Sequence, residues 1–297
     1  MDFKQLESFV TIAKLKSFSK SADKLYLTQP TISNHIHLLE KELGTILFNR
    51  TNKNITLTRA GDILYEYAIS ILNKKDHAYF SLNEFKGKIE GTLEISSSSI
   101  PELYFLTDAI CRFNAKYPDV KYNLMKYDTR QVIDKIISGD IDFGIVGAKK
   151  DINQLEYIEI MGDDITLITP TKGSLSNISN FTTANCLETP LILREDGSGT
   201  RSSVLQYLTA NGINTEALNI IAEVESNETI KKLVELGLGI SFLSKRSIEK
   251  EVSEGLIKYL PINDEYISRK FYFVYHKKRV LSPLSETFKN FILSDKT

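Results

Sequence analysis

The stretch that most limits the fold of this chain is residues 28–44, with the sequence TQPTISNHIHLLEKELG. Its apolar residues recur at spacings of four, three and four, and they are Ile32, Ile36, Leu39 and Leu43. Residues so spaced share one face of an α-helix. Thr28 is a favourable N-cap, Gly44 is a favourable stop, and Pro30 is tolerated because first-turn N–H groups have no partner within the helix. The stretch is therefore predicted to be an amphipathic helix.

The opposite face of this predicted helix is polar. Its side chains are small or can both donate and accept hydrogen bonds, and they are Pro30, Thr31, Ser33, Asn34 and His37. Such groups suit the reading of base edges in the major groove of DNA. Taken alone, the same pattern fits an ordinary amphipathic helix with a solvated exterior equally well.

Two helices are predicted before this stretch and a hairpin after it. Residues 3–16 carry a helical stripe, and Ser19 is expected to cap a second helix that runs through Tyr26. Next, the run LFNRTNKNITLT places turn residues between two short apolar segments, which predicts a two-stranded wing. Arg50 and Lys53 of this wing are placed to meet phosphates. Helix, helix, recognition helix and wing within about 60 residues are typical of a DNA-binding module.

These elements coincide with matches at many fixed spacings. The segments MDFKQLESFV, SFSKSADKLYLTQPTISNHIHLLEKELGTILFNR and ITLTRAG carry Gln29-Pro30, Leu39-Glu40, Glu42-Leu43-Gly44, Leu47-Phe48 and Arg50. Residues 1 to about 68 thereby resemble the N-terminus of LysR-type transcriptional regulators nearly end to end. The resemblance implies DNA-groove contacts from Gln29, Pro30, Ser33 and Asn34, with Arg50 holding the DNA backbone. The family frequently has a basic residue where this chain has Asn34 and His37, so its recognition helix is less cationic.

Residues 59–88 are predicted to form one long helix capped by Thr58. A seam repeats along it at alternating spacings of four and three, with one polar interruption: Leu64, Ala68, Ile71, Lys75, Ala78, Leu82 and Phe85. A helix with such a heptad seam needs a partner surface. The resemblance supplies the same helix of a second subunit, which implies a homodimer, and dimers of this family pair into homotetramers. Packing against the chain's own C-terminal domain is the alternative.

The distribution of charge predicts that the N-terminal part of the chain is the part that binds a polyanion. Residues 1–88 carry 13 Lys and Arg against 9 Asp and Glu, whereas the remainder carries 24 against 29. No apolar run approaches the roughly 18 residues of a membrane span, and the charged start is unlike a secretory signal. We therefore expect a cytoplasmic protein. Cys111 and Cys186 have no metal-ligand spacing around them and are expected to be free thiols, with a redox role for either left open.

Residues 89–297 alternate β-rich and helical segments, as a parallel α/β sheet does. Two such sets are predicted, joined by crossing strands near residues 161–164 and 267–271, with a cleft between them. This arrangement resembles the two-lobed, type II periplasmic-binding-protein-like effector domain of the same family. The predicted domains are a winged helix-turn-helix (1–58), a linker helix (59–88) and this α/β effector domain, with lobe I at 89–161 and 268–297 and lobe II at 162–267.

Three strand-to-helix junctions of this domain are rich in hydroxyl residues, at 96–99, 197–201 and 226–227. Ligands bind outside the carboxyl ends of parallel strands, and helix N-termini attract anions. Helix capping is the simpler explanation of each junction alone. However, glycines flank Ser198, and LREDGSGTR resembles a motif of the family branch that includes regulators of sulfur and carbon assimilation. The predicted effector residues are Ser98, Ser99, Thr129, Gly147, Ser198, Thr200, Arg201 and Asn227. Arg201 either binds the anion or pairs with a neighbouring carboxylate.

Two other classes of protein fit this sequence less well. The Gly-Ser-Gly at Ser198 is neither a nucleophile elbow nor a phosphate-binding loop, and His276 is the one histidine behind residue 88, so no catalysis is expected. An exported binding protein would need the signal that the N-terminus lacks. We therefore expect a regulator without metal or cofactor that binds double-stranded operator DNA. Its small anionic effector, such as a carboxylate, sulfate or phosphate, is expected to close the lobes and change the DNA bend. RNA polymerase is considered as a further partner.

Overall fold

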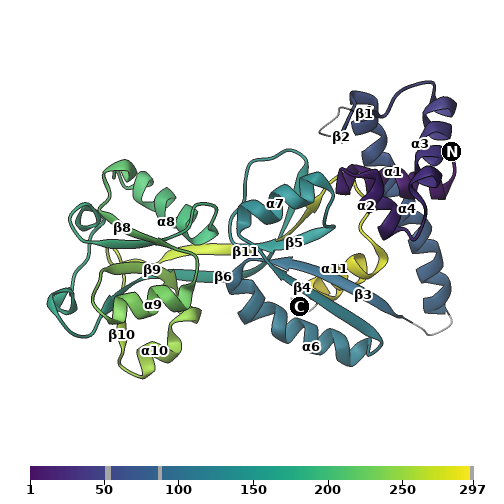
Figure 1. The fold of residues 1–297 in the computed structure, drawn as a ribbon. Helices are drawn as coiled ribbons and strands as arrows, with labels where there is room; N and C mark the ends of the chain where they lie inside the picture. The colour runs from purple at the N-terminus through teal and green to yellow at the C-terminus, as the bar shows by residue number, and fades with distance from the viewer. Residues whose placement is uncertain (51–54, 86–88, 295–297) are drawn as a thin grey trace.

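The computed structural model describes residues 1–50, 55–85 and 89–294, and it contains three successive parts (Figure 1). A small helical head with a β-hairpin lies at one end, and one long helix follows it. The rest is a two-lobed α/β domain whose lobes lie side by side along a shared sheet. The predicted fold class, a winged helix-turn-helix and linker helix before a two-lobed α/β domain, is confirmed.

The head consists of three helices and a two-stranded hairpin: α1 (Phe3–Leu15), α2 (Phe18–Lys24), α3 (Gln29–Leu43), β1 (Phe48–Arg50) and β2 (Ile55–Leu57). Thr28 Oγ1 accepts the N–H of Thr31 at 3.3 Å, and Gly44 ends α3 in the left-handed conformation, as predicted. The predicted cap of α2 is wrong. Ser17, not Ser19, accepts the N–H of Lys20, because Lys16 is left-handed and ends α1 directly before it.

The apolar face of α3 anchors the head. Ile32, Ile36 and Leu39 are fully buried against α1, where the Phe9 ring lies 5.3 Å from that of Phe48 in the hairpin. Leu43 was predicted to share this face, but 41% of it is exposed because the helix ends there. The buried stripe is therefore three residues long, and it fixes which side of α3 faces outward.

The long helix α4 (Arg59–Phe85) is held by both the head and lobe I. Ala68 of the predicted seam is fully buried in the head core, Leu64 and Ile71 pack against that core, and Lys75 Nζ pairs with Glu7 of α1 at 2.7 Å. The first half of the seam therefore serves the chain's own head. Among the described side chains of α4, the large apolar ones that are exposed are Ile63, Tyr67, Tyr79 and Leu82, and the side chain of Phe85 from the predicted seam lies outside the described residues.

Side chains of α4 contact lobe I through hydrogen bonds to its backbone carbonyls. Tyr65 Oη donates to Ser138 O at 2.9 Å, Asn73 donates to Val280 O, and His77 Nε2 lies 2.7 Å from Leu281 O. The alternative partner for this helix, its own C-terminal domain, is thus in contact with it. No helix among the described residues is long and apolar enough to cross a membrane.

A single sheet of nine described strands runs through both lobes in the order β4-β3-β5-β11-β6-β9-β7-β8, with β10 beside β6. The strands are β3 (Gly91–Ser97), β4 (Val120–Lys126), β5 (Phe143–Val146), β6 (Leu155–Pro170), β7 (Leu191–Arg194), β8 (Ile220–Val224), β9 (Ile240–Ser244), β10 (Ile257–Leu260) and β11 (Ile267–His276). β3 is parallel to β4 and β5, and β7 is parallel to β8 and β9. The antiparallel pair β6 and β11 crosses from lobe to lobe, as predicted.

Helices cover both faces of this sheet (Figure 1). Lobe I carries α5 (Ser99–Pro101), a π-helical stretch η1 (Glu102–Leu106), α6 (Thr107–Lys116), α7 (Thr129–Ser138) and the C-terminal α11 (Pro283–Ser294). Lobe II carries α8 (Gly199–Ala210), α9 (Asn227–Glu235), α10 (Glu249–Ser253), η2 (Ser174–Asn177), η3 (Thr183–Leu187), η4 (Thr215–Ala217) and η5 (Lys245–Ser247). The two lobes have separate cores.

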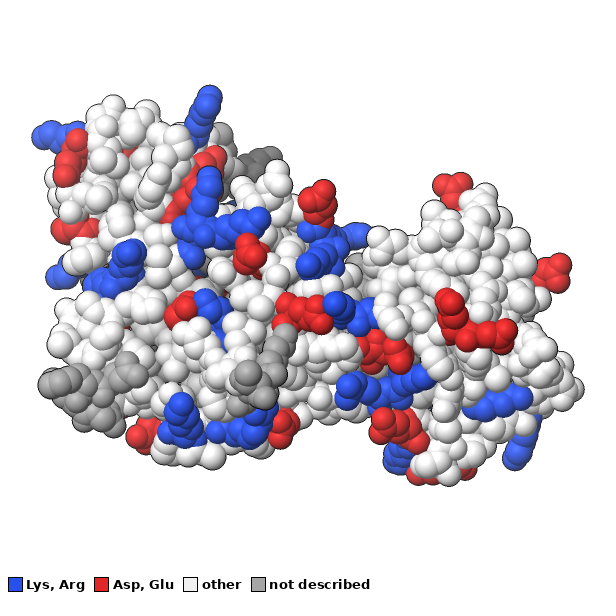
Figure 2. Space-filling view, turned by 180° about the vertical axis from the view of Figure 1, so that it is seen from behind, with Lys and Arg blue, Asp and Glu red and all other residues white. Residues whose placement is uncertain are grey.

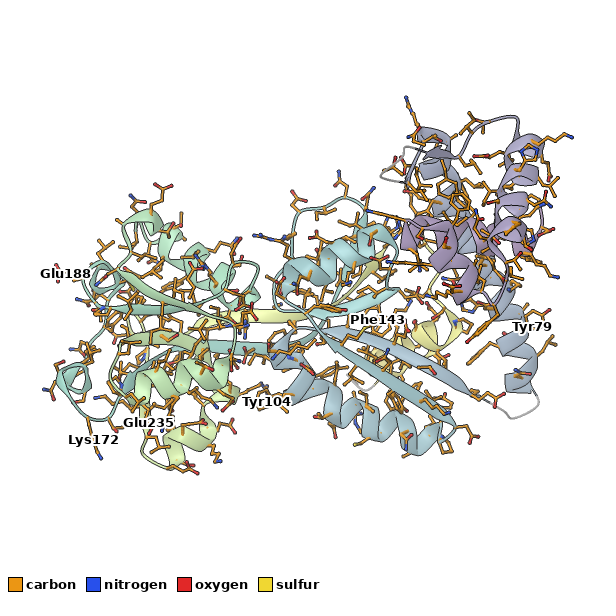
Figure 3. All side chains as sticks on the ribbon, in the orientation of Figure 1. Tyr79, Tyr104, Phe143, Lys172, Glu188 and Glu235 are labelled. Carbon is orange, nitrogen blue, oxygen red and sulfur yellow. The ribbon has the colours of Figure 1, made fainter. Side chains whose placement is uncertain are left out.

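The main core of lobe I contains a group of buried phenylalanines, whereas the core of lobe II is mainly aliphatic. Phe143 stacks on Phe273 at 4.5 Å, between the sheet and α11, and Figure 3 shows it inside lobe I. In the same view Lys172 and Glu188 point outward at the far end of lobe II, and Tyr79 points away from α4. The waist between the lobes carries side chains of both charges (Figure 2).

The difference between Ile36 and Leu43 gives a test of the head. Ile36→Ala opens a cavity in a closed core and is expected to destabilise the head by about 2–5 kcal/mol. Leu43→Ala removes a side chain that is already 41% exposed, so a loss below about 1 kcal/mol is expected. Urea unfolding followed by circular dichroism measures both. Equal losses in the two variants would contradict the three-residue stripe.

Candidate functional site

The outward side of α3 presents the residues predicted to read DNA. Gln29, Pro30, Asn34 and His37 are exposed, and Thr31 and Ser33 are half-buried beside them. Gln29 Nε2 donates to Ser33 Oγ at 3.1 Å, and Thr28 and Thr31 share a hydroxyl hydrogen bond of 2.8 Å. Within residues 1–50, 55–85 and 89–294, the side chains of Asn34 and His37 form no hydrogen bond. Both are therefore free to meet an outside partner.

An exposed tyrosine beside α3 was missed by sequence reasoning. Tyr26 lies in the turn between α2 and α3, with 96% of its surface exposed and a left-handed φ of 55°. Such a φ is uncommon for a non-glycine residue. No periodicity marks a single turn residue, so the sequence held no signal for it. Its position beside the polar edge of α3 adds it to the candidate DNA-facing surface.

The wing is fixed to the recognition helix. β1 and β2 pair with Phe48 opposite Leu57, and Glu40 Oε1 of α3 accepts the N–H of Leu47 at 2.8 Å. Lys53, which was predicted to meet phosphates, lies outside the described residues, and so does the side chain of Arg50. On the face of the head seen in Figure 2, basic and acidic side chains alternate rather than gather by sign.

A second candidate site lies between the lobes. A narrow cavity of about 20 Å³ lies there, and six of the predicted effector residues line it: Ser98, Ser99, Thr129 and Gly147 from lobe I, and Ser198 and Thr200 from lobe II. Segments about 100 residues apart in sequence meet here because α7 and α8 begin on opposite sides of the crossing strands. The hydroxyl-rich junctions at residues 96–99 and 197–201 therefore do converge.

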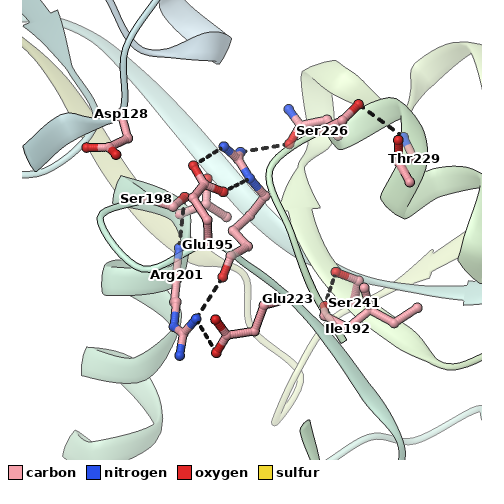
Figure 4. A network of polar contacts seen from close by, with 12 residues as sticks. Asp128, Ile192, Glu195, Ser198, Arg201, Glu223, Ser226, Thr229 and Ser241 are labelled. Atoms are coloured by element: carbon pink, nitrogen blue, oxygen red, sulfur yellow. Dashed lines mark hydrogen bonds and ion pairs between the residues drawn. The ribbon is translucent and has the colours of Figure 1, made fainter. Parts of the chain in front are cut away.

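The other two predicted effector residues do not line this cavity. Arg201 Nη1 pairs with Glu223 Oε1 at 2.7 Å and donates to Arg194 O at 3.0 Å, so it makes the carboxylate pair that was one of its two alternatives. Asn227 Oδ1 accepts from Arg194 Nη1 at 2.8 Å. Figure 4 shows this network, in which Arg194 also forms a two-bonded ion pair with Glu195. Arg201 and Asn227 thus position other residues.

Helix capping accounts for part of the hydroxyl pattern. Ser198 Oγ accepts the N–H of Arg201 at the start of α8, and Ser226 Oγ accepts that of Thr229 at the start of α9. Ser98 makes no side-chain cap, and Asp128 caps α7 through the N–H of Gln131. Capping therefore explains Ser198 and Ser226 but leaves Ser98 free for a ligand.

Thr129 has a buried hydroxyl without a partner. The residue is 2% exposed, and in the described part of the chain its Oγ1 has no hydrogen bond. It faces the first turn of α8, where a Cβ added to Gly199 would lie 2.9 Å from this oxygen. A buried polar atom left unpaired is costly, and such atoms call for a water, an ion or a functional role. The N-termini of α7 and α8 thus face each other around an unsatisfied hydroxyl.

A buried arginine, which sequence reasoning missed, forms the floor of the cleft. Arg269 of β11 donates through Nε to Asp163 Oδ2 of β6 at 2.8 Å and through Nη1 to Thr200 Oγ1 at 2.8 Å. Burial lowers the pKa of this guanidinium, and the Asp163 carboxylate beside it opposes that shift. Ser244 Oγ donates to the other oxygen of Asp163 at 2.7 Å. Arg269 therefore ties both crossing strands to the start of α8.

A second ion pair closes the cleft at its edge. Arg130 of lobe I donates two hydrogen bonds, of 2.8 and 3.0 Å, to Asp196 of lobe II. The hydrogen bonds raise the pKa of Arg130 and lower that of Asp196. Both side chains are exposed, so water and salt screen this pair. It holds the lobes together loosely in comparison with the buried Arg269.

The cysteines lie away from both candidate sites. Burial raises the pKa of the Cys186 thiol to about 12, which keeps it protonated and unreactive at neutral pH, while Cys111 is exposed on α6. Neither residue lines the interlobe cavity. In the described residues, no group of three or more His, Cys, Asp or Glu side chains is placed to hold a metal ion.

Two family models match this chain. The bacterial regulatory helix-turn-helix protein, lysR family, matches residues 3–62, and the LysR substrate binding domain matches residues 86–296. The regulator CysL of Bacillus subtilis is 29% identical over 98% of this chain and 94% of its own length. The probable RuBisCO transcriptional regulator of Cyanidium caldarium is 31% identical over 93% of this chain and 88% of its own length.

Solved structures show the same fold. A full-length OxyR variant from Pseudomonas aeruginosa aligns with a TM-score of 0.75 at 20% identity, over 99% of this chain and 94% of that one. The regulatory domain of Synechocystis CcmR, in complex with 2-PG, aligns with a TM-score of 0.62 at 24% identity, over 69% of this chain and 97% of that one. With its helix-turn-helix head and two-lobed domain both matched, this chain belongs to the LysR family of DNA-binding transcriptional regulators, which are not enzymes.

Proposed function

We propose that this LysR-type regulator binds double-stranded operator DNA through α3 and the wing, and that a small anion in the interlobe cleft changes this binding. The observation that carries the DNA contact is the free polar edge of α3. Asn34 and His37 are exposed there, while Ile32, Ile36 and Leu39 anchor the helix from behind. Asparagine can bond adenine through two hydrogen bonds in the major groove, so Asn34 is the strongest candidate for base reading.

The cleft has the chemistry of an anion site. The N-termini of α7 and α8 direct backbone N–H groups toward it, and Thr129 adds a hydroxyl without a partner in the described residues. Arg269, whose charge is balanced by Asp163, lines the same cavity and donates a hydrogen bond to Thr200. The CcmR regulatory domain, which has the same fold, is in complex with 2-PG, which supports a small-molecule role for this cleft.

The route from effector to DNA runs along α7. Its first residue, Thr129, lines the cleft, and its last residue, Ser138, accepts the hydrogen bond from Tyr65 of α4. Arg279 also binds the carbonyls of Ile136 and Ile137 at the same end. A shift of α7 on effector binding therefore moves α4, and with it the head, which changes the separation and bend of bound DNA.

Dimer formation through α4 is part of the proposal. The exposed apolar residues Ile63, Tyr67, Tyr79 and Leu82 leave a face that neither the head nor lobe I covers. A second α4 would cover it and place two heads at half-sites a helical turn apart or a multiple of it. We extend this homodimer to a homotetramer acting in the cytoplasm, with RNA polymerase as a further partner.

Asn34→Ala tests base reading. Loss of a bidentate base contact is expected to weaken binding to a selected operator by about 5- to 150-fold, or about 1–3 kcal/mol, and to leave binding to random duplex unchanged. Fluorescence anisotropy at fixed salt, on an operator selected from random duplexes, measures both. Gln154→Ala, an exposed change in lobe I, is the matched control. Equal weakening on both duplexes would show a contact to the DNA backbone instead.

Thr129→Val tests the cleft. The change removes an unpaired buried hydroxyl, so the ligand-free protein is expected to keep or gain about 1 kcal/mol of stability while its response to ligand is lost. Thr169→Val is the control, because Thr169 Oγ1 is equally buried and unpaired among the described residues but lies in lobe II on β6. Thermal shifts with sulfate, phosphate and small carboxylates measure the response. A full response in Thr129→Val would contradict this cleft as the anion site.

A further inference from the structure

The charges around the cleft divide it into two openings of opposite sign. Both openings adjoin the inner cavity between Thr129 and Ser198. One is a cavity of about 320 Å³ whose charged lining residues are Asp128, Glu195 and Glu225 with Lys126 and Arg194. The other is a cavity of about 220 Å³ whose charged lining residues are Arg130, Lys149, Lys150 and Arg201 with Asp196.

Internal ion pairs remove some of these charges from ligand binding. In the larger opening, Glu195 holds Arg194 with two hydrogen bonds of 2.7 and 2.8 Å. Asp128 uses one oxygen to cap α7, and Glu225 is exposed and forms no ion pair with a described residue. Two carboxylates therefore remain against one lysine, Lys126. The charge left for a ligand in this opening is negative.

In the smaller opening, the charges that remain after the internal ion pairs are set aside are positive. Arg130 pairs with Asp196, and Arg201 pairs with Glu223. Lys149 lies over the Tyr272 ring at 4.6 Å, and Lys150 has no carboxylate partner among the described residues. Two lysines are thus available on this side. A ligand between the openings meets carboxylates on one side and ammonium groups on the other.

The inner cavity can hold an acid group because its two lining carboxylates, Asp128 and Glu195, are matched in number by two lining guanidinium groups, those of Arg194 and Arg269. The first turns of α7 and α8, two helices of 10 and 12 residues, meet there, and the buried Thr129 Oγ1 needs a partner. Figure 4 shows Asp128 across from Ser198 and Glu195 at the same place. A second negative group of a ligand would be repelled on the Asp128 side, whereas a positive group there would be attracted.

We propose that the effector is a zwitterion with the chemistry of an α-amino acid. Its acid group lies between the N-termini of α7 and α8, and its ammonium group lies beside Asp128 and Glu225. Its side chain extends toward Lys149 and Lys150, which favours acidic or neutral side chains over basic ones. This inference rests on the proposed function in one respect, namely that the cleft is the effector site.

Matched ligand pairs test the ammonium directly. The pairs are L-alanine and L-lactate, L-serine and glycerate, L-aspartate and L-malate, and L-glutamate and 2-hydroxyglutarate, in which a hydroxyl replaces the ammonium. Thermal unfolding of the full chain can be followed by the fluorescence of its 14 tyrosines, since it has no tryptophan. We expect at least one amino acid to raise the melting temperature, and its hydroxy acid to need at least a tenfold higher concentration for the same shift. Hydroxy acids that act equally well, or no response to any amino acid, would overturn the proposal.

Two variants test where the ammonium group of the ligand lies. Asp128→Asn removes the charge and keeps the cap of α7, because asparagine caps helices as well as aspartate does. Glu225→Gln removes the second charge. Each variant is expected to weaken binding of the amino acid at least fivefold. Each is also expected to reduce the difference in binding between the amino acid and its hydroxy acid. Glu254→Gln, an exposed change elsewhere in lobe II, is the control and should change neither. An unaltered advantage in both cleft variants would show that these carboxylates do not hold the ammonium.

The outcomes for the ligand class and for the proposed function are separate. If an acid without an amine stabilises the chain and changes its affinity for operator DNA, the zwitterion is wrong and the regulator with an anion-binding cleft stands. If Thr129→Val responds to ligands as fully as the unaltered chain, the cleft itself is wrong.

Discussion

The buried ion pair between Arg269 and Asp163 is the constraint on which the geometry of this regulator depends. It joins the two strands that cross between the lobes, in direct register, and its third partner is Thr200 at the start of α8. A charge taken out of water is tolerated when an opposite charge is paired with it, and Asp163 lies within 2.8 Å of both Nε and Nη2 of Arg269. Losing either partner would leave an unpaired charge in the waist, so the relative placement of α7 and α8 relies on this pair.

A movement at this waist is transmitted to the head more easily than across the rim of the cleft. Lobe I is bound to α4 through Tyr65, Asn73 and His77, and α4 shares its core with the head through Ala68. The contact between the lobes at the rim, by contrast, is the exposed pair of Arg130 and Asp196. Screened pairs break readily, whereas packed cores move as units. Under the proposed function, a ligand therefore changes the angle between the lobes, and lobe I transmits that change to the head.

Sequence reasoning predicted what depends on local spacing. The stripe of Ile32, Ile36 and Leu39, the cap at Thr28 and the convergence of the hydroxyl-rich junctions all follow from periodicity or from the ends of parallel strands. It missed Arg269 because its partner Asp163 is 106 residues away and no local pattern links them. The surface that covers the heptad seam on α4 could not be predicted, because the sequence pattern is the same whether a second subunit or the chain's own head covers it. Ala68 shows that the head takes part of it.

The size of the inner cavity decides the direction of the change. We expected from sequence that the effector would close the lobes. The inner cavity of about 20 Å³ is room for roughly one water molecule, whereas the openings that adjoin it measure about 320 and 220 Å³. A ligand shifts an equilibrium only toward the state that it binds better, and an acid group larger than one water molecule needs a wider inner cavity. Under the proposed function we therefore expect effector binding to move the start of α8 away from Thr129 and to release the exposed Arg130–Asp196 pair, which is the opposite direction to the closure expected from sequence. The form that it stabilises is more open at the rim, hinged at the waist that Arg269 and Asp163 keep intact.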